Sequence, residues 1–502
     1  MAQAPTAAVT IPTAACVPCN LVDRKGRPPN GHWQMDRKWF FSAGVRGVQS
    51  SPSNNRSPSP SRASDRQPGI SGATAAEDGQ PSHSPMADLD EAFVRKLSSQ
   101  LRWHNRNLLA CTQTFLPNFV TEVVQHGVGN RTKLELPLIG QRSGCVACIV
   151  CSGFHELAQR CQEQPNGAHA LTKYIGRFFT WVVDIITAYR GDILRLVGDT
   201  LVVLFEAGND TEAFHSACGS LCCKHSSDEL ACLRAAACSM ELHKRLHHLD
   251  VGNCSGLLTL RIGVGIGSLA FVVVRGISYT GSSPSNEFTV TGPPLQQATK
   301  AEELAGPHET VFSSRAWKHV QHIAVGGAPA DSLGEFRHFI ALDVSRHTYP
   351  MVRHAAQQSH KSQTPAALAD MRSGIVRRCL GQLMSFLPHA VLRHLWAGTL
   401  SNVNEARMIS FAVVRVSGLP AGITSEAMAT TARFTAEMQR AAYTEEGFLH
   451  RFLIDGSGGL EVQLAFGLPP LVHLDDPLRA CRACLRLLRI ATRFRFSAQA
   501  GI

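Results

Sequence analysis

The chain has 502 residues but no apolar run near the eighteen or so residues that a membrane-spanning helix requires. A run such as Leu269 to Val274 has only the length of a strand. Runs of lysine and arginine with interleaved aromatics are also absent, although the net charge is +10. Residues 1–86 hold nine Lys/Arg against five Asp/Glu, so part of the basic excess lies in a tail. We therefore expect neither a membrane span nor a nucleic-acid partner.

Sixteen cysteines are present, but no cysteine pair is followed by a second pair at zinc-finger spacing. The two-residue gap typical of metal ligands occurs in Cys16/Cys19, in Cys145/Cys148/Cys151 and in Cys481/Cys484. The middle group follows the pattern of an apolar strand and the last group that of a helix, where small buried thiols are the ordinary explanation. We therefore expect free thiols and a reducing compartment rather than a structural metal.

The composition, with 44% hydrophobic and 18% charged residues, is typical of a globular protein with several domains. Ser, Pro, Asn, Gly and Arg dominate residues 47–87, and such a segment buries too little apolar surface to fold. The pattern predicts a disordered tail or linker over 1–87, a helical lead-in over 88–142, a first domain over 143–344, a helical linker over 345–404 and a second domain over 405–502.

The first domain alternates strands and helices. The strand pattern "CVACIV" leads to the turn "CSGF", then to a helix through "ALTKYIGRFFTWVVDIITAYR" and to the hairpin "GDILRLVGDTLVVLF", whose tip is Gly198-Asp199. A helix over 229–249 follows, then strands "LLTLRIGVGIG", "LAFVVVRG" and "NEFTVTG" and the helix "PLQQATKAEELA". This order predicts an α+β fold of the ferredoxin-like class.

The second domain repeats the first. "ISFAVVRVSGL" (409–419) places Ser417-Gly418-Leu419 on Ser152-Gly153-Phe154, and residues 494–502 align with residues 260–268. "GFLHRFLIDGSGGLEVQLAFG" (447–467) aligns with the first hairpin, with arginines at Arg195 and Arg451 and aspartates at Asp199 and Asp455. We expect tandem ferredoxin-like domains, the second of them truncated.

Taken together, the S-G-F turn, the "GDILRLVGDTLVVLF" hairpin and the "RIGVGIG" strand resemble the catalytic domain of class III nucleotidyl cyclases. The tandem arrangement with a helical linker is most similar to the soluble, bicarbonate-responsive adenylyl cyclases. The resemblance covers about residues 115–502 and is strongest in the hairpin.

The resemblance implies that two aspartates, one on the first strand and one at the hairpin tip, hold Mg²⁺ or Mn²⁺ on the triphosphate of ATP. Asp199 is at the hairpin-tip position, where it is a metal ligand or a structural turn residue. The first-strand position is Val150, and Arg415 in the second copy, and neither side chain can bind a cation. We therefore expect a weak metal site.

The other nucleotide contacts are also assigned by resemblance. Ser152, Gly153 and Phe154 correspond to the turn that receives phosphates, with Gly198 beside the metal position. The alternative is an ordinary turn with Phe154 in the core. Arg195 and Arg451 occupy a lysine position that contacts adenine or lines an effector pocket, or they face solvent.

The family also uses Asn and Arg, spaced N-x-x-x-R, as catalytic residues on the helix that follows a V-x-G turn, here "VTG" at 290–292. Gln296 and Lys300 occupy these positions, and a lysine does not replace the planar guanidinium without loss. The second copy has no such segment, so we expect that this chain cannot complete a composite site alone.

These inferences predict a cytoplasmic adenylyl-cyclase-like protein that forms cyclic AMP and pyrophosphate from ATP, with weak activity or none by itself. One alternative is a catalytically dead pseudo-cyclase that acts as a regulatory or dimerisation partner, either of a second cyclase subunit or in a homodimer. Another is a nucleotide-independent interaction domain with the same fold.

Overall fold

The computed structural model describes residues 105–129, 135–162, 167–208, 226–247, 258–278, 285–343, 352–353, 373–397, 409–419, 425–454, 459–469 and 471–502. The predicted tail and the helix expected in "LDEAFVRKLSSQLRW" lie outside the described residues, and the helical lead-in is described only from residue 105 onward. None of the helices in these ranges is both long enough and apolar enough to cross a membrane.

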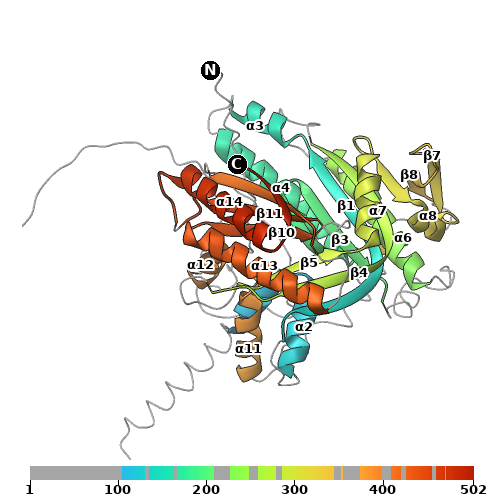
Figure 1. Ribbon diagram of the computed structural model, residues 1–502. Helices are drawn as coiled ribbons and strands as arrows, with labels where there is room; N and C mark the ends of the chain where they lie inside the picture. Colours follow the sequence, from blue (N-terminus) through green and yellow to red (C-terminus); the bar gives the residue numbers. More distant parts are fainter. Residues whose placement is uncertain are drawn as a thin grey trace, which may run out of the picture. The chain divides into compact units, whose positions relative to one another are not determined.

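The first domain contains an eight-stranded sheet in the order β2-β3-β1-β4-β6-β8-β7, with β5 paired to β4 (Figure 1). Its elements, in chain order, are β1 (Leu138–Ser152), α3 (Phe154–Gln162), α4 (Gly167–Ala188), β2 (Asp192–Val197), β3 (Thr200–Glu206), α6 (Ser227–His247), β4 (Thr259–Val274), β5 (Glu287–Thr291), α7 (Pro293–Glu303), β6 (Thr310–Ser313), α8 (Ser314–Val320), β7 (Ala324–Pro329) and β8 (Phe336–Leu342).

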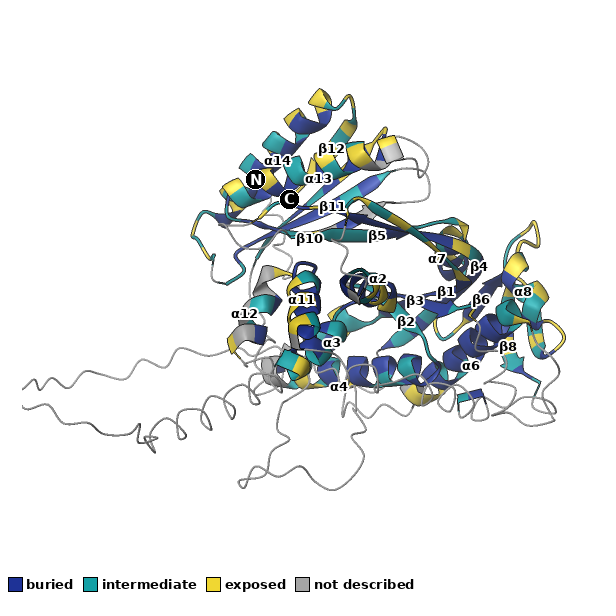
Figure 2. Ribbon diagram, turned by 90° about the horizontal axis from the view of Figure 1, so that it is seen from below, coloured by how far each residue is buried: buried dark blue, intermediate teal, exposed yellow. Residues whose placement is uncertain are grey.

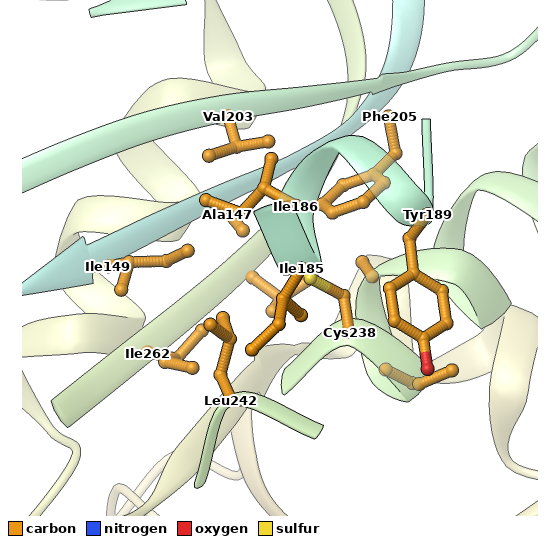
Figure 3. Close-up of a cluster of buried hydrophobic side chains, with 14 of the residues drawn as sticks. Ala147, Ile149, Ile185, Ile186, Tyr189, Val203, Phe205, Cys238, Leu242 and Ile262 are labelled. Atoms are coloured by element: carbon orange, nitrogen blue, oxygen red, sulfur yellow. The ribbon is translucent and has the colours of Figure 1, made fainter. Parts of the chain in front are cut away.

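Strand β1 is buried on both faces because its alternate side chains enter two different cores. Cys145, Ala147 and Ile149 pack with α4 and α6, and Figure 3 shows Ala147 and Ile149 among Ile185, Tyr189, Val203 and Leu242. Val146 and Cys148 enter the opposite core, which also contains residues of α2 (Asn118–Gly129) and α11 (Ser373–Met384). This double burial explains why the sequence of β1 reads as a continuous apolar run.

The second domain contains a four-stranded sheet in the order β10-β11-β9-β12. Its elements are β9 (Ser410–Ser417), α13 (Ser425–Thr444), β10 (Phe448–Ile454), β11 (Leu460–Phe466), α14 (Asp476–Arg493) and β12 (Ser497–Gly501), preceded by the linker helices α11 and α12 (His389–Ala397). This order matches β2-β3-β1-β4 of the first sheet strand for strand. The predicted α+β class is confirmed, and the two sheets share one order of four strands, as in ferredoxin-like folds.

The two copies also share backbone features that the sequence repeat does not reveal directly. Gly153 and Gly418 have φ of 101° and 91°, and the residues before each hairpin, Arg190 and Glu446, have φ of 59° and 58°. Each first hairpin strand carries a register shift at the same place, just before Arg195 and just before Arg451. These coincidences support a true duplication.

Several expectations need correction. The two strands expected from "LLTLRIGVGIG" and "LAFVVVRG" are one strand, β4, which runs through Gly267 at φ 145°. The S-G-F turn is followed by a separate helix, α3, before the long helix begins at Gly167. The second hairpin has a longer tip, since β10 ends at Ile454 and β11 begins at Leu460.

The alignment of residues 494–502 with residues 260–268 is wrong by four residues. Leu260 lies opposite Cys151, and the residue opposite the equivalent Val416 is Ala498, not Phe494. The alignment matched Arg-Phe with Arg-Ile as if both pairs belonged to a strand. Phe494 and Phe496 precede β12, however, and their rings pack against Phe434.

The two domains share part of one core. Val272 and Val274, from the C-terminal half of β4, belong to the apolar cluster of the second domain together with Phe434 and Met438 of α13. The amide of Gln439 joins the same region, because its Nε2 donates to the Ser285 carbonyl at 2.9 Å and to Glu287 at 3.0 Å. The segment β4–β5 is therefore an arm that the first domain extends onto the second.

Candidate functional site

Asp199 lies at the two-residue tip between β2 and β3, and it is exposed. Its main-chain carbonyl accepts a hydrogen bond from the amide of Cys151 at 2.9 Å, so the tip is pinned beside the end of β1. The hydroxyl of Thr200 donates to Asp199 Oδ1 at 3.1 Å. The hairpin tip therefore lies next to the turn that follows β1.

Val150 sits between two polar neighbours in the sheet. It lies opposite Thr200 on β3 and opposite Arg261 on β4, and its side chain is 8% exposed. A valine offers no ligand atom, so the strand position expected to supply the second carboxylate is apolar. The equivalent Arg415 is opposite Glu461 and pairs with it at 3.4 Å.

An ion pair adjoins Asp199. Arg261 Nη2 is 2.9 Å from Glu302 Oε1 on α7, and the side chain of Glu302 is only 8% exposed. Burial raises the pKa of the Glu302 carboxyl, the charge of Arg261 opposes this shift, and the charge of Asp199 adds to it. Burial raises the pKa of the Cys148 thiol to about 12, so this cysteine stays protonated.

Ser152, Gly153 and Phe154 form the turn from β1 into α3, and all three are partly buried. The positive φ of Gly153 suits glycine, and its carbonyl accepts from the amide of Leu157 at 3.0 Å. The ring of Phe154 lies 5.8 Å from those of Phe178 and Phe179. Phe154 therefore has a core role, and a phosphate contact at this turn stays a prediction for the backbone.

Arg195 points to the second domain. Its Nη2 donates to the carbonyl of Phe452 on β10 at 2.8 Å and lies 3.4 Å from the Thr289 hydroxyl on β5. These contacts give Arg195 a bridging role, and a contact with a nucleotide base remains untested. The side chain of Arg451 and the position of Asp455 lie outside the described residues.

Gln296 and Lys300 lie on the outer face of α7, and both are exposed. Lys300 Nζ is 4.0 Å from Glu335 and 5.3 Å from the ring centre of Phe336, on the side away from Glu302. The structure therefore does not join these two residues to Asp199 in one site. The neighbouring Gln297 faces the sheet, where its Oε1 accepts from Ser313 at 2.8 Å.

The residues at Asp199 do not fit a two-metal centre. Two hard cations need several oxygen ligands, and the position that should supply the second carboxylate is Val150. Glu302 is already paired with Arg261. Within the described ranges no group of three or more His, Cys, Asp or Glu side chains could hold an ion. The ten cysteines in these ranges are all free.

Arg261 and Glu302 are the charged neighbours of Asp199 that the sequence did not reveal. Their proximity depends on the register of β1 with β4 and on the packing of α7 across these strands. In the sequence, the repeated glycines of "RIGVGIG" indicate that another element packs closely against this strand. A Cβ on Gly263 would lie 2.0 Å from the Ala298 carbonyl oxygen, so α7 rests directly on the backbone of β4.

No protein-family model matches the chain, and no curated protein matches it. Similar solved structures include the adenylyl cyclase CyaB from P. aeruginosa, 17% identical, TM-score 0.30, covering 40% of this chain and 96% of that one. The guanylate cyclase domain of RhGC from Catenaria anguillulae is 11% identical, with a TM-score of 0.30, over 40% of this chain and 99% of that domain. A bacterial light-regulated adenylyl cyclase is 14% identical, with a TM-score of 0.33, over 56% of this chain and 71% of that one. At these identities and TM-scores the likeness identifies no substrate or activity for this chain.

Proposed function

We propose that the protein is a cytoplasmic adenylyl-cyclase-like protein with a degenerate active site, which forms cyclic AMP and pyrophosphate from ATP weakly at most by itself. Two features support the cyclase assignment: the hairpin motif around Asp199 and the duplicated ferredoxin-like topology. The hairpin tip is also pinned to the end of β1 through the Cys151 amide.

The expectation of weak activity rests on one observation, which is that the first-strand position holds no carboxylate. Val150 in one copy and Arg415 in the other occupy that position, and neither side chain supplies a second carboxylate to share an ion with Asp199. In reactions at phosphorus the protein contributes mainly positioning and charge neutralisation. Weak binding of the cation therefore lowers the rate of cyclisation directly.

The test is formation of cyclic nucleotide by the purified full chain, supplied with ATP or with GTP and with Mg²⁺ or Mn²⁺. We expect a trace of cyclic AMP that depends on the metal, and its loss in Asp199→Ala. The matched control is Glu426→Gln, which changes an exposed carboxylate on α13 and leaves the trace unchanged. An Asp199→Ala protein as active as the parent would contradict the site assignment.

A second candidate function is a pseudo-cyclase that regulates another cyclase subunit. The bridging contacts of Arg195 favour it, because this residue is committed to holding the two domains together. In this case the chain binds no ATP, with or without Mn²⁺, and changes the rate of an added active cyclase domain. Binding of ATP abolished by Asp199→Ala would instead favour the first candidate.

A further inference from the structure

The β4–β5 arm has two faces, and they enter different cores. Val272 and Val274 belong to the core of the second domain, whereas Phe271 and Val273 belong to the core that contains Leu383 of the linker helix α11. Neighbouring side chains of a strand point to opposite sides of the sheet, so this division follows from the strand geometry. Figure 2 shows β5 beside β10, with α13 on one side of the arm and α11 on the other. The arm is therefore a layer between the second domain and the linker helix.

The second domain holds the base of the arm through one side chain. Gln439 of α13 is fully buried, and its Oε1 accepts a hydrogen bond from the Ile277 amide at 2.8 Å. Its Nε2 donates to the Ser285 carbonyl at 2.9 Å and to Glu287 Oε1 at 3.0 Å. Ile277 follows β4 and Ser285 precedes β5, so a single amide joins both strands of the arm to α13.

The linker holds the same base from the other side. Asn286 donates twice to Ser385, from its main-chain amide to the carbonyl at 2.7 Å and from Nδ2 to Oγ at 2.8 Å. The Ser385 hydroxyl donates in turn to the Gln382 carbonyl of α11 at 2.6 Å, and Ser385 is buried. The Oδ1 of Asn286 accepts from the Gly276 amide at 3.4 Å, across the base of the arm. We call the two hydrogen bonds between Asn286 and Ser385 the latch.

The latch and the contacts of Gln439 depend on each other. Ser285 and Glu287, which both accept from Gln439, are the chain neighbours of Asn286. The backbone has little free space here, because a Cβ on Gly276 would lie 1.7 Å from the Ser285 carbonyl oxygen and 2.4 Å from Gln439 Oε1. A displacement of Asn286 therefore moves the partners of Gln439, and a buried amide that loses its partners is unfavourable.

We propose that the latch couples the linker helix α11 to the contact between the two domains. With the latch closed, Asn286 keeps its two neighbours within reach of Gln439, and the arm stays packed on α13. A shift of α11 that breaks the latch releases these neighbours, so the second domain separates more readily from the arm. The linker then controls how firmly the first domain holds the second, in addition to connecting the two. A purely local role, in which Ser385 only ends α11, would leave the contact with α13 unchanged.

The test is hydrogen exchange of the full chain, read peptide by peptide by mass spectrometry, in Ser385→Ala. This change removes the hydroxyl to which Asn286 Nδ2 donates. We expect exchange in α13 and β10 to accelerate about tenfold, as the loss of one buried hydrogen bond predicts. The control is Ser239→Ala on α6, where a buried hydroxyl donates to the Ala235 carbonyl at 2.9 Å. The control should leave the rates in α13 and β10 unchanged, and circular dichroism checks that both variants fold.

Double variants test whether the effect passes through Asn286 and Gln439. Asn286→Ala should accelerate exchange in the same peptides, and Ser385→Ala added to it should change these rates by about twofold at most, because the latch is already broken. Ser385→Ala should likewise add little to Gln439→Leu. Faster exchange confined to α11, single effects that multiply in the double variants, or an equal acceleration by Ser239→Ala would each overturn the proposal.

Discussion

At the residue scale, the candidate site differs from a competent metal site mainly at Val150. This side chain lies opposite Thr200, the residue after Asp199, so a carboxylate placed there would be near the hairpin tip. Arg261 on the other side already pairs with Glu302 and is therefore partly neutralised. A single change can thus test whether the missing carboxylate limits cation binding.

We predict that Val150→Asp raises the affinity for Mn²⁺ about tenfold or more, because two carboxylates can then share the ion. Electron paramagnetic resonance of free Mn²⁺ during a titration measures this affinity. Val150→Asn, which has a similar shape and no charge, should bind Mn²⁺ as weakly as the parent. Equal binding by the aspartate and asparagine variants would show that position 150 does not face the cation.

The sequence singled out Asp199, the turn after β1 and the arginines of the hairpins as candidates, but it did not reveal the residues that contact them. Asp199 could be found because Gly-Asp between two apolar strands fixes a tight turn within a few residues. The contacts of Arg195, Lys300 and Glu302 with Phe452, Glu335 and Arg261 could not be predicted, because they join segments far apart in the chain. Only the register and the packing of whole elements bring these pairs together.

At the element scale, the contact of α7 with β4 depends on glycine. A Cβ on Gly263 would lie 2.0 Å from the Ala298 carbonyl oxygen and 2.2 Å from the Glu302 amide nitrogen, both of them backbone atoms that cannot move alone. We predict that Gly263→Ala lowers the free energy of unfolding by about 3 kcal/mol through overpacking. Urea unfolding measures this loss. Gly140→Ala on β1, where nothing lies within 4 Å of the added carbon, should change stability little, and equal losses would contradict the argument.

The arm formed by β4 and β5 contains a carboxyl group whose titration affects stability. Burial raises the pKa of Glu287 to about 8, although the hydrogen bond from Gln439 and the charge of Arg195 lower it. In the unfolded chain the group titrates near 4.5, so between these values the folded protein binds more protons. The contribution of Glu287 is therefore complete below the unfolded pKa and is lost as the pH rises through the folded pKa.

We predict that stability falls with rising pH between about 5 and 8 by up to about 1.4 kcal/mol per pH unit from this group. In Glu287→Gln this part of the slope should vanish. Thermal unfolding of the two proteins across the pH range gives the difference, and Glu426→Gln serves as the exposed control. A slope that is the same in all three proteins would show that Glu287 ionises in the folded state as it does in the unfolded one.

At the scale of the whole molecule, the duplication was predictable but the contact between the copies was not. Short sequence echoes with equal spacing, such as Arg195 with Arg451, identify a repeat even when few residues match. They do not reveal that the C-terminal end of β4 packs in the core of the second domain. The apolar run from Leu269 to Val274 is compatible with burial in either core. The same ambiguity caused the four-residue error at β12, where Phe496 is apolar for packing against Phe434 and not for pairing with β9.

The shared core makes a prediction about how the domains depend on each other. Val264 and Val274 are both on β4 and both 0% exposed, but Val264 packs in the first core and Val274 in the core of the second domain. Truncation of either valine to alanine should cost about 2 kcal/mol in its own core. We predict that Val274→Ala raises the hydrogen-exchange rates of β9, β10 and β11 amides about 30-fold, because these strands open more often when the core of the second domain loses a side chain. Val264→Ala should leave those rates nearly unchanged and raise them in β1 and β3. If both variants accelerated exchange equally in both sheets, the two domains would open as one cooperative unit; if Val274→Ala affected only the first sheet, β4 would not belong to the second core in solution.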